Sequence, residues 1–285
     1  MFAYDVYRFV MQNVSAKSCM FFTDDYIIGK TSYSPAACLR RMLLKRKIRK
    51  TLPSVNDLYV ISDEMQKAYC KLFGVDSYVI RNFSVEKKET DAEIQSDIQS
   101  ECLTMVYAGG LHYNRWKVLK QIAKSLKEIN DSEKRKCFLK VYSSQNLSNK
   151  IVEAINLDGA SEFCGSLSAS QIAEIYAGAD ILLHVESFDS NAIASTKYSF
   201  STKIPEYLSA GKCVLAVGPA EVASIRYLSD FACVIHDDTH LTSALKKMIL
   251  DDDYRNSVQN ACTVHYEADF SRAKQKECME HILSI

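Results

Sequence analysis

The sequence predicts an α/β fold in which helices cover both faces of a doubly wound parallel sheet. Short apolar segments alternate with segments of helical periodicity along most of the 285 residues. The apolar segments are near-continuous runs, which is typical of strands that are buried on both faces of a sheet. No internal repeat or low-complexity segment interrupts this order.

The N-terminal part, residues 1–85, contains only two or three β-α units. We expect strands within residues 18–25, 56–65 and 77–83. A long helix is expected at residues 36–52. These units resemble the end of a Rossmann-type domain, so this part is predicted to be a partial Rossmann-like domain. The following segment is polar and lacks an apolar face, and residues 86–101 are therefore predicted to be a linker.

The alternation becomes regular over residues 102–268, which predicts a Rossmann-like domain. Ser62 in the N-terminal part and Ser168 in this domain are expected to cap helices, and Ser168 has capping-box spacing to Gln171. Residues 269–285 are predicted to form a C-terminal helix. Six strands are expected in the regular part, with helices between them: 102–110, 137–144, 160–165, 179–185, 212–218 and 231–237.

Charge and composition argue against several classes of protein. The 35 Lys and Arg residues balance 35 Asp and Glu residues, so nucleic acid is not an expected partner. No apolar run approaches the roughly 20 residues of a membrane span, and the N-terminus has no cleavage-site pattern. The ten cysteines include no C-x-x-C pair, so we interpret them as buried apolar side chains in a reducing cytosol. The predicted location is cytoplasmic, and no metal site is expected.

Residues 199–212, SFSTKIPEYLSAGK, predict a short helix whose start can bind an anion. A long polar loop precedes it, at the end of a strand where ligands bind in open α/β sheets. Ser201 or Thr202 can cap the helix, whose free first-turn N–H groups attract negative charge, and Lys203 adds a positive charge. Glu206, one turn later, is a good acceptor for two vicinal sugar hydroxyls. An ordinary capped helix is the alternative.

A second segment, YAGGLHYNRWKVLKQIAKSL, ends a strand with Gly109 and Gly110 and then enters a helix. The glycines allow a ligand to approach the backbone, and Arg115 and Lys117 stand where they can meet phosphate. The segment lacks the G-x-G-x-x-G pattern, so no dinucleotide fingerprint is present. A glycine turn followed by solvated basic residues is the alternative.

In their order and spacing these segments resemble the donor-binding half of GT-B glycosyltransferases, close to glycosyltransferase family 4. The resemblance covers about residues 55–270 and is carried by DLYVISDEMQKAYCKLFGVDSYVIRNF, VYAGGLHYNRWKVL, FCGSLSASQIAEIYAGADILLHV and STKIPEYLSAGKCVLAVG. It implies two Rossmann-like domains, a nucleotide-sugar donor held mainly by the C-terminal one, and an acceptor at the N-terminal one. It also implies transfer with retention of configuration, usually without a metal or other cofactor, and a C-terminal helix that crosses back to the N-terminal part.

The resemblance assigns roles to residues by position. It places Glu206 on the ribose hydroxyls of the donor. It places five residues at the donor diphosphate: Thr202, Lys203, Gly109, Gly110 and Arg115. Four more are expected near the nucleobase: Tyr142, Ser143, Phe163 and Gly165.

The sequence also departs from the family pattern. The Glu-x7-Glu motif would need an acid at position 198, which is Tyr198, so Glu186 or Asp189 in the preceding loop are candidates to replace it. Position 110 is Gly where many members have Arg, and position 213 is Cys where many have Pro. The sugar and the catalytic carboxylate therefore stay open.

The N-terminal part is shorter than the resemblance implies. A complete domain would need about 150 residues, so we expect either a fragment or a chain that another chain completes. Asp25, in FFTDDYIIG, is a candidate for an acceptor contact or a general base, and an acid in a solvated loop is the alternative.

Residues 39–50, LRRMLLKRKIRK, contain seven Lys or Arg residues and no acid. Such a helix can lie on an anionic membrane surface, which suits family members with lipid-linked acceptors. The alternative is a helix packed on its sheet with a solvated basic face.

The predicted function is transfer of a sugar from a nucleotide-diphosphate sugar to a saccharide or lipid-linked acceptor in cell-surface polysaccharide or glycolipid biosynthesis. The alternative is a module that binds a nucleotide sugar but is catalytically incomplete. A nucleotide-sugar epimerase or dehydrogenase is disfavoured, because the dinucleotide fingerprint and a suitably placed Tyr-x-x-x-Lys pair are missing.

Overall fold

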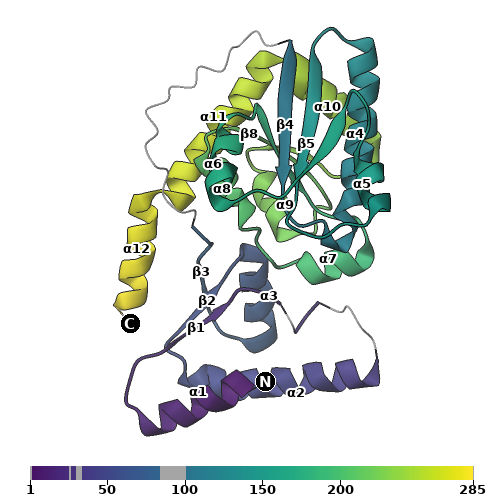
Figure 1. Ribbon diagram of the computed structural model, residues 1–285. Coiled ribbons are helices and arrows are strands. Elements are labelled where there is room, and N and C mark those ends of the chain that lie inside the picture. Colours follow the sequence, from purple (N-terminus) through teal and green to yellow (C-terminus); the bar gives the residue numbers. More distant parts are fainter. Residues whose placement is uncertain (1, 26, 30–33, 84–100, 285) are drawn as a thin grey trace. The chain divides into compact units, whose positions relative to one another are not determined.

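The computed structural model describes residues 2–25, 27–29, 34–83 and 101–284, and the chain divides into two compact units (Figure 1). The first unit combines Met1–Asn82 with Ile193–Phe200 and Arg272–Ile285. The second combines Phe83–Ala192 with Ser201–Ser271. The predicted linker lies mostly in 84–100, outside the described residues.

The first unit is built on a parallel sheet in the order β1-β2-β3, with Phe22 opposite Val60 and Val60 opposite Val79. Its strands are β1 (Cys19–Phe22), β2 (Asp57–Val60) and β3 (Tyr78–Val79). Its helices are α1 (Phe2–Asn13), α2 (Pro35–Thr51), the 3-10 turn Leu52–Ser54, α3 (Asp63–Phe73) and α12 (Arg272–Leu283).

Local signals in the sequence fix the helices of this unit. The Ser62 hydroxyl accepts a hydrogen bond from the Met65 N–H at 3.2 Å, so the predicted cap of α3 is confirmed. Gly74 ends α3 with φ 71°, a left-handed conformation that glycine adopts without steric cost. Buried Tyr69 of α3 packs edge-on against Phe22 of β1, with ring centroids 5.1 Å apart, and so joins helix to sheet.

Two later segments of the chain return to the first unit. The Ser62 hydroxyl also donates to the Tyr198 carbonyl at 2.7 Å, which ties residues 193–200 to the start of α3. The His281 ring of α12 lies against the Tyr59 and Tyr78 rings, with centroid distances of 6.0 and 4.5 Å. The helix predicted for 269–285 is therefore present as α12 and packs on the N-terminal sheet.

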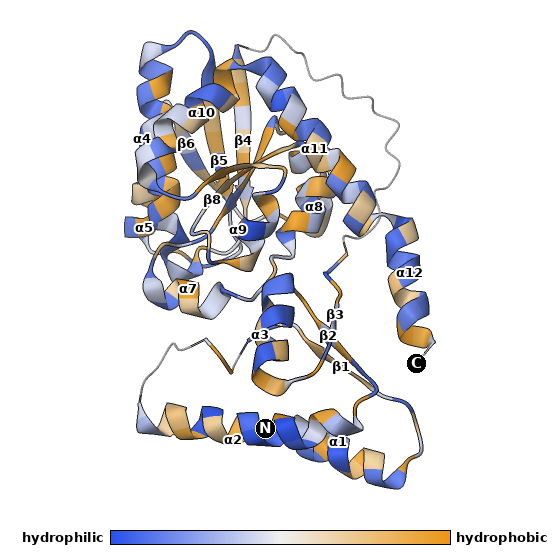
Figure 2. Cartoon of the chain, turned by 180° about the vertical axis from the view of Figure 1, so that it is seen from behind, coloured by the Kyte–Doolittle hydropathy of each residue, from blue (hydrophilic) through white to orange (hydrophobic). Residues whose placement is uncertain are grey.

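The second unit contains a six-stranded parallel sheet in the order β6-β5-β4-β7-β8-β9. All six strands fall within the predicted segments or extend one residue beyond them, which confirms the predicted doubly wound sheet. Figure 1 shows α4 and α10 on one side of this sheet and α6 and α8 on the other, and the reverse view in Figure 2 agrees. The strands are β4 (Cys102–Ala108), β5 (Lys136–Tyr142), β6 (Ser161–Gly165), β7 (Ile181–Val185), β8 (Cys213–Val217) and β9 (Cys233–Ile235).

Helices connect these strands, and the Ser168–Gln171 capping box at the start of α6 is present as predicted. The helices are α4 (Arg115–Ser132), α5 (Asn149–Ile155), α6 (Ala169–Ala177), α7 (Ser190–Thr196), α8 (Lys203–Ser209), α9 (Ala223–Leu228), α10 (Leu241–Leu250) and α11 (Asp252–Phe270), with 3-10 turns at His112–Asn114 and Asp238–His240.

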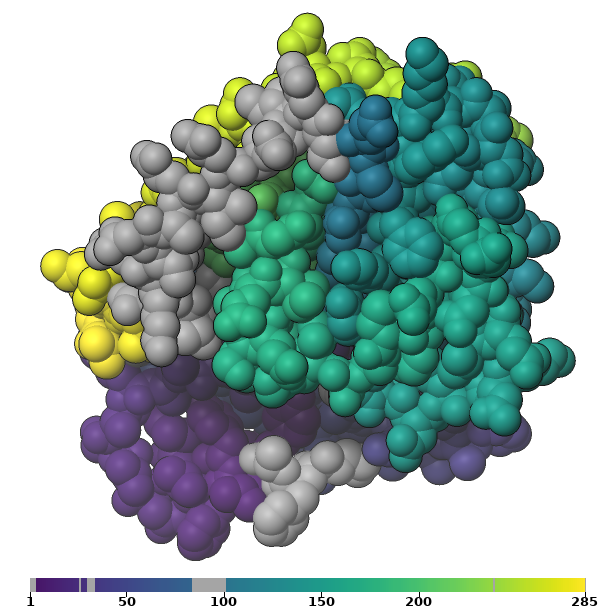
Figure 3. All heavy atoms as spheres, turned by 45° about the horizontal axis from the view of Figure 1, so that its top comes forward, coloured from purple at the N-terminus to yellow at the C-terminus, as the bar shows by residue number. Residues whose placement is uncertain are grey.

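The core of the second unit lies in its central strands. Every residue of β7 and β8 is buried, which explains why, apart from His184, their side chains are apolar. The ribbons of β4, β5 and β8 are largely orange in Figure 2, and the teal and green atoms of this unit form a closely packed outer surface in Figure 3.

The interpretation of the cysteines as buried side chains is wrong for half of them. Cys164 is exposed because β6 is an edge strand whose residues alternate between the interior and solvent, and Cys102 is exposed at the first position of β4. The buried cysteines are Cys137, Cys213, Cys233 and Cys262. The exposed ones are Cys19, Cys38, Cys70, Cys102 and Cys164.

The segment around the predicted anion-binding helix also differs from expectation. The helix α8 is shorter than residues 199–212, and the loop expected at 186–198 contains the short helix α7. The alanine and serine residues of this segment are compatible with a helical turn, but its polar composition predicted a loop. Among the described residues, no helix is both long enough and apolar enough to cross a membrane.

Candidate functional site

The sheet of the second unit has a topological switch point between β4 and β7. From β4 the chain runs outward to β5 and β6, and it then returns to the other side of β4 to form β7, β8 and β9. In open α/β sheets, ligands bind in the crevice beyond the carboxyl ends of the strands at such a point. Gly109 and Glu186 follow directly after β4 and β7 at this end of the sheet.

A buried ion pair joins the two sides of this crevice. The Arg115 guanidinium at the start of α4 donates to Glu186 Oε2 from Nη2 at 2.8 Å and from Nε at 3.2 Å. The side chains are 13% and 4% exposed, so little water screens the pair. Gly218, at the end of β8, leaves room for Glu186, because a Cβ at that position would lie 2.8 Å from the Glu186 Cβ.

Burial controls the charges in the crevice. It raises the pKa of the Glu186 carboxyl, and the attraction of Arg115 offsets part of that rise. It also lowers the pKa of His184 to about 3, with a further contribution from Arg115, so this imidazole is neutral. His184 Nε2 lies 3.6 Å from Glu186 Oε1 and, among the described residues, has no hydrogen-bond partner.

The glycine turn after β4 is held by several side chains. The Tyr107 hydroxyl donates to the Gly110 carbonyl at 2.7 Å, and Gln145 Oε1 accepts from the Leu111 N–H at 2.6 Å. The His112 ring lies where a Cβ at position 110 would stand, at 2.5 Å from Nδ1. His112 Nε2 is also 3.0 Å from Arg115 Nη1. Glycine at position 110 thus makes room for a histidine that contacts the arginine.

The predicted nucleobase residues lie at the carboxyl ends of β5 and β6. The Gly109 N–H donates to the Tyr142 carbonyl at 3.0 Å, and the Ser143 N–H donates to the Gly165 carbonyl at 2.8 Å. Gly165 has φ 84°, in the left-handed region, which ends the pairing of the edge strand. Phe163 is partly exposed on β6. Backbone hydrogen bonds therefore join two pairs of predicted site residues beside the crevice, Gly109 with Tyr142 and Ser143 with Gly165.

Helix α8 reaches the same end of the sheet through Tyr207, whose hydroxyl accepts from the Ala108 N–H at 3.3 Å. Lys203 Nζ donates to Glu206 Oε2 at 2.9 Å, and the Tyr176 hydroxyl donates to the same oxygen at 3.5 Å. The Lys203 and Glu206 side chains are 27% and 34% exposed, so neither points into the apolar interior.

The start of α8 is capped from the preceding residues. The Ser201 hydroxyl accepts from the Lys203 N–H at 3.3 Å, whereas the Thr202 hydroxyl makes no capping bond. The predicted cation and carboxylate are thus brought together and neutralise each other, and both stay accessible to solvent.

Several solved structures of other proteins are similar to this chain. No family model matches the sequence, and no curated protein matches it. Anabaena HepE in complex with UDP and glucose is similar, with a TM-score of 0.67 at 13% identity over 99% of this chain and 75% of that chain. Sucrose-phosphate synthase of Thermosynechococcus elongatus is similar with a TM-score of 0.66 at 13% identity, over 99% of this chain and 71% of that chain. WaaG, a glycosyltransferase involved in lipopolysaccharide biosynthesis, is similar with a TM-score of 0.58 at 15% identity, over 92% of this chain and 76% of that chain.

The chain has the GT-B glycosyltransferase fold. This confirms the fold that the sequence resemblance implied.

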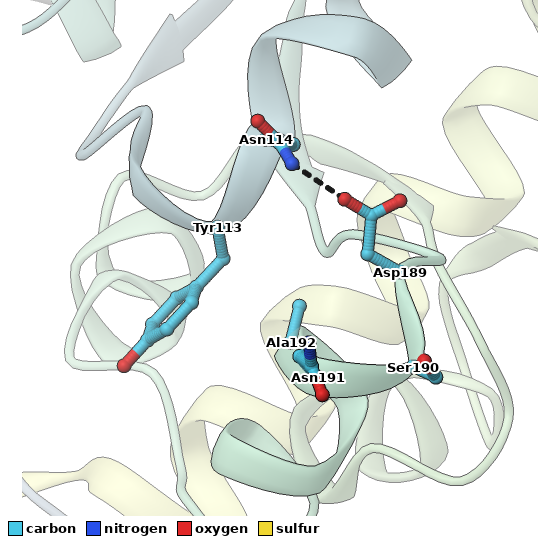
Figure 4. Close-up of a pocket in the computed structure, with 6 residues that line it drawn as sticks. All are labelled: Tyr113, Asn114, Asp189, Ser190, Asn191 and Ala192. Carbon is cyan, nitrogen blue, oxygen red and sulfur yellow. Dashed lines mark hydrogen bonds between the residues drawn. The ribbon is translucent and has the colours of Figure 1, made fainter. Parts of the chain in front are cut away.

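Within the GT-B fold, the loop after β7 presents Asp189 beside the start of α4. Asn114 Nδ2 donates to Asp189 Oδ2 at 2.6 Å (Figure 4). Lys117 Nζ lies 3.4 Å from the same oxygen. The hydrogen bond from Asn114 and the charge of Lys117 lower the pKa of Asp189. This carboxylate, 41% exposed, is therefore ionised and accessible, whereas the other candidate in the loop, Glu186, is buried and paired.

Asp25, the acid predicted on the acceptor side, belongs to the first unit and organises its own loop. Its carboxylate accepts from the N–H groups of Ile27 and Ile28 at 2.9 and 3.0 Å and from Gly29 at 2.5 Å. The Tyr69 hydroxyl donates to it as well, at 3.1 Å. These four donors give Asp25 a structural function in the loop, and its role as a base stays a prediction.

Sequence reasoning missed several residues of the GT-B crevice. Gly218 follows β8 directly and Gln145 is the third residue after β5, so the rule that ligands meet strand ends could have indicated them. No signal in the sequence pairs Arg115 with Glu186, because the two residues are 71 positions apart. Among the described residues, no group of three His, Cys, Asp or Glu side chains is arranged to hold a metal ion.

Proposed function

We propose that the chain is a glycosyltransferase that moves a sugar from a nucleotide-diphosphate sugar to an acceptor. The observation that carries this proposal is Arg115, a guanidinium fixed by buried Glu186 at the switch point beside the glycine turn. A positive charge held at a ligand crevice with low water access is suited to a diphosphate. The similarity to HepE, whose structure contains UDP and glucose, supports a uridine nucleotide as the first donor to test.

The neighbouring groups suit the other parts of such a donor. Lys203 supplies a second cation for the diphosphate, together with the backbone of Gly109, Gly110 and Thr202. Glu206 has one carboxylate oxygen that accepts from Lys203 and Tyr176, and its second oxygen can accept from ribose hydroxyls. We place the nucleobase at the ends of β5 and β6, near Tyr142, Ser143, Phe163 and Gly165.

In this mechanism the acceptor hydroxyl attacks the anomeric carbon and the bond from that carbon to the diphosphate oxygen breaks. Arg115 and Lys203 stabilise the negative charge that develops on the departing diphosphate, so a metal is not needed for this task. The proton of the acceptor goes to the diphosphate or to a carboxylate, for which Asp189, Glu186 and Asp25 are the candidates. Retention of configuration is proposed on the resemblance to family 4.

We further propose that the acceptor is a saccharide or a lipid-linked saccharide of cell-surface polysaccharide or glycolipid biosynthesis, used at the cytoplasmic face of a membrane. Helix α2 supports this, because Leu39, Met42 and Leu43 are exposed beside seven Lys and Arg residues in 39–50. Apolar side chains flanked by cations suit an anionic lipid surface. Sedimentation with vesicles that contain anionic lipid tests this placement, and binding that persists equally with neutral vesicles in high salt would contradict it.

A catalytically incomplete nucleotide-sugar-binding module is the second candidate. Three observations favour it: position 198 is a tyrosine, Glu186 is buried against Arg115, and Asp25 is occupied by four donors. Among the candidate carboxylates, Asp189 is ionised and 41% exposed, which leaves it as the main candidate for a catalytic role.

Titration calorimetry with UDP, GDP and their glucose and mannose derivatives tests the donor site. We expect binding of at least one nucleotide, and a loss of roughly tenfold or more in Arg115→Gln, because hydrogen bonds to charged groups contribute about 1.5–3 kcal/mol. Lys127→Gln, at an exposed site on the same helix, is the matched control. Release of free sugar or its transfer to added glycolipid separates the two candidates: binding without either reaction supports the module, and no binding removes both.

A further inference from the structure

A pocket of about 340 Å³ lies between the turn that precedes α4 and the start of α7 (Figure 4). Its volume is in the range of about 300–1,000 Å³ that is usual for small-molecule sites. The pocket mixes an aromatic ring with carboxylate, amide and hydroxyl groups and has no strongly apolar wall. The lining residues are Tyr113, Asn114, Asp189, Ser190, Asn191 and Ala192.

An unusual backbone conformation brings two of these side chains to the pocket. Tyr113 and Asn114 have φ values of 58° and 63°, so two consecutive non-glycine residues are left-handed. Such a conformation costs on the order of 1–3 kcal/mol for each residue and is concentrated at functional sites. Tyr113 is 46% exposed, and its ring makes a T-shaped contact with the His112 ring at a centroid distance of 4.8 Å, so much of the Tyr113 ring is open to solvent.

The polar groups of the pocket are held in fixed positions. Asp189 Oδ2 is bound by Asn114 Nδ2 at 2.6 Å and lies 3.4 Å from Lys117 Nζ. In the part of the chain that the structure describes, Asp189 Oδ1 accepts no hydrogen bond. The pocket therefore presents an oriented carboxylate oxygen and an amide on one side and an exposed aromatic ring on the other (Figure 4).

We propose that this pocket binds a pyranose ring, with its apolar C–H face on Tyr113 and two vicinal hydroxyls on Asp189 and Asn114. A sugar combines an apolar face with adjacent hydroxyl groups, and an aromatic ring beside a carboxylate–amide pair matches both features. The ionised carboxylate disfavours a phosphate in the same place. The inference rests on the proposed function for the origin of the ring, which is the donor's sugar or the acceptor's terminal sugar.

Calorimetry with UDP and UDP-glucose tests the donor arm. If the ring belongs to the donor, the wild-type chain binds UDP-glucose more tightly than UDP. Asp189→Asn and Tyr113→Asn then lose about tenfold in affinity for UDP-glucose, while UDP affinity stays within about twofold. Asparagine at position 113 tolerates the left-handed backbone, so this variant removes the ring without adding strain. Tyr113→Phe keeps the ring and should retain the preference.

Saturation-transfer NMR with methyl α-glucoside in the presence of UDP tests the acceptor arm. If the ring belongs to the acceptor, the glycoside gives a saturable signal that Asp189→Asn abolishes and that Asp131→Asn, at the opposite end of α4, leaves intact. Sugar binding by neither arm, or sugar binding that the changes at Tyr113 and Asp189 do not alter, overturns the inference. If UDP does not bind at all, the proposed function fails, and the glycoside experiment without nucleotide still decides whether the pocket binds a sugar.

Discussion

The buried pair of Arg115 and Glu186 makes a demanding prediction about stability. Replacing Arg115 with methionine keeps most of the side-chain volume and leaves a carboxylate that is 4% exposed without its cation. Breaking a buried pair by removing one partner costs about 3–5 kcal/mol, because the remaining charge is neither solvated nor paired. We therefore expect Arg115→Met to lower the free energy of unfolding by about 3 kcal/mol or more at pH 8.

The loss should depend on pH, because Glu186 can become neutral by taking up a proton. Burial raises the pKa of this carboxyl above its unfolded value, and the rise is larger when Arg115 no longer opposes it. The folded state then binds more protons than the unfolded state, so stability falls as the pH rises through the folded pKa. Arg115→Met should therefore be less destabilising at pH 5.5 than at pH 8.

Urea unfolding followed by circular dichroism measures both effects. The double variant Arg115→Met, Glu186→Leu should recover most of the lost stability, because no unpaired charge is left. Lys127→Met, which breaks the exposed pair with Asp131 on the same helix, is the matched control and should change stability little. A loss below about 1 kcal/mol in Arg115→Met at pH 8, or a double variant as unstable as the single one, would refute the reasoning.

Three further predictions concern parts of the fold outside the crevice. Ser168→Ala removes the capping box of α6 and should cost about 1 kcal/mol, seen as a shift of roughly 2–4 °C in the thermal midpoint; no shift contradicts the cap. Gly29→Ala should be clearly destabilising, because its Cβ would lie 2.2 Å from the Ala194 carbonyl oxygen. Gly178→Ala is the control, because its Cβ meets its nearest atom at 3.5 Å. Equal thermal midpoints for the two variants would count against this packing. The Asp252 carboxylate is partly desolvated, but hydrogen bonds from two arginines lower its pKa, so it stabilises the fold above about pH 4 and stops doing so in acid. Asp252→Asn should therefore reduce stability at pH 7, and its difference from wild type should shrink as the pH falls. A difference that does not depend on pH would show that the ion pairs contribute nothing.

Local chemistry explains what could be predicted from the sequence. The central strands were predictable because burial on both faces favours near-continuous apolar runs, as in β7 and β8. Helix starts were predictable where a serine has an amide or a carboxylate within one turn, as at Ser62 and Ser168. The glycine turn and the basic start of α4 were predictable because both lie within one short segment.

The remaining features depend on contacts between distant segments. The pairing of Arg115 with Glu186 follows from the adjacency of β4 and β7, which no local pattern encodes. Exposure of Cys164 follows from the edge position of β6, which could not be read from its sequence. The sequence left Asp25 available for catalysis, because one of its four hydrogen-bond donors, Tyr69, lies 44 residues away and is not visible in the local pattern. Charge and spacing thus indicated the residues of the candidate site, and tertiary packing decided which of their side chains are accessible.

A crystal structure of the chain with UDP tests the central claim most directly. We predict the diphosphate in the crevice beyond β4 and β7, with its oxygens within hydrogen-bond distance of Arg115 and of the backbone at Gly109 and Gly110. A nucleotide bound elsewhere, with Arg115 still enclosed by Glu186 and His112, would contradict it.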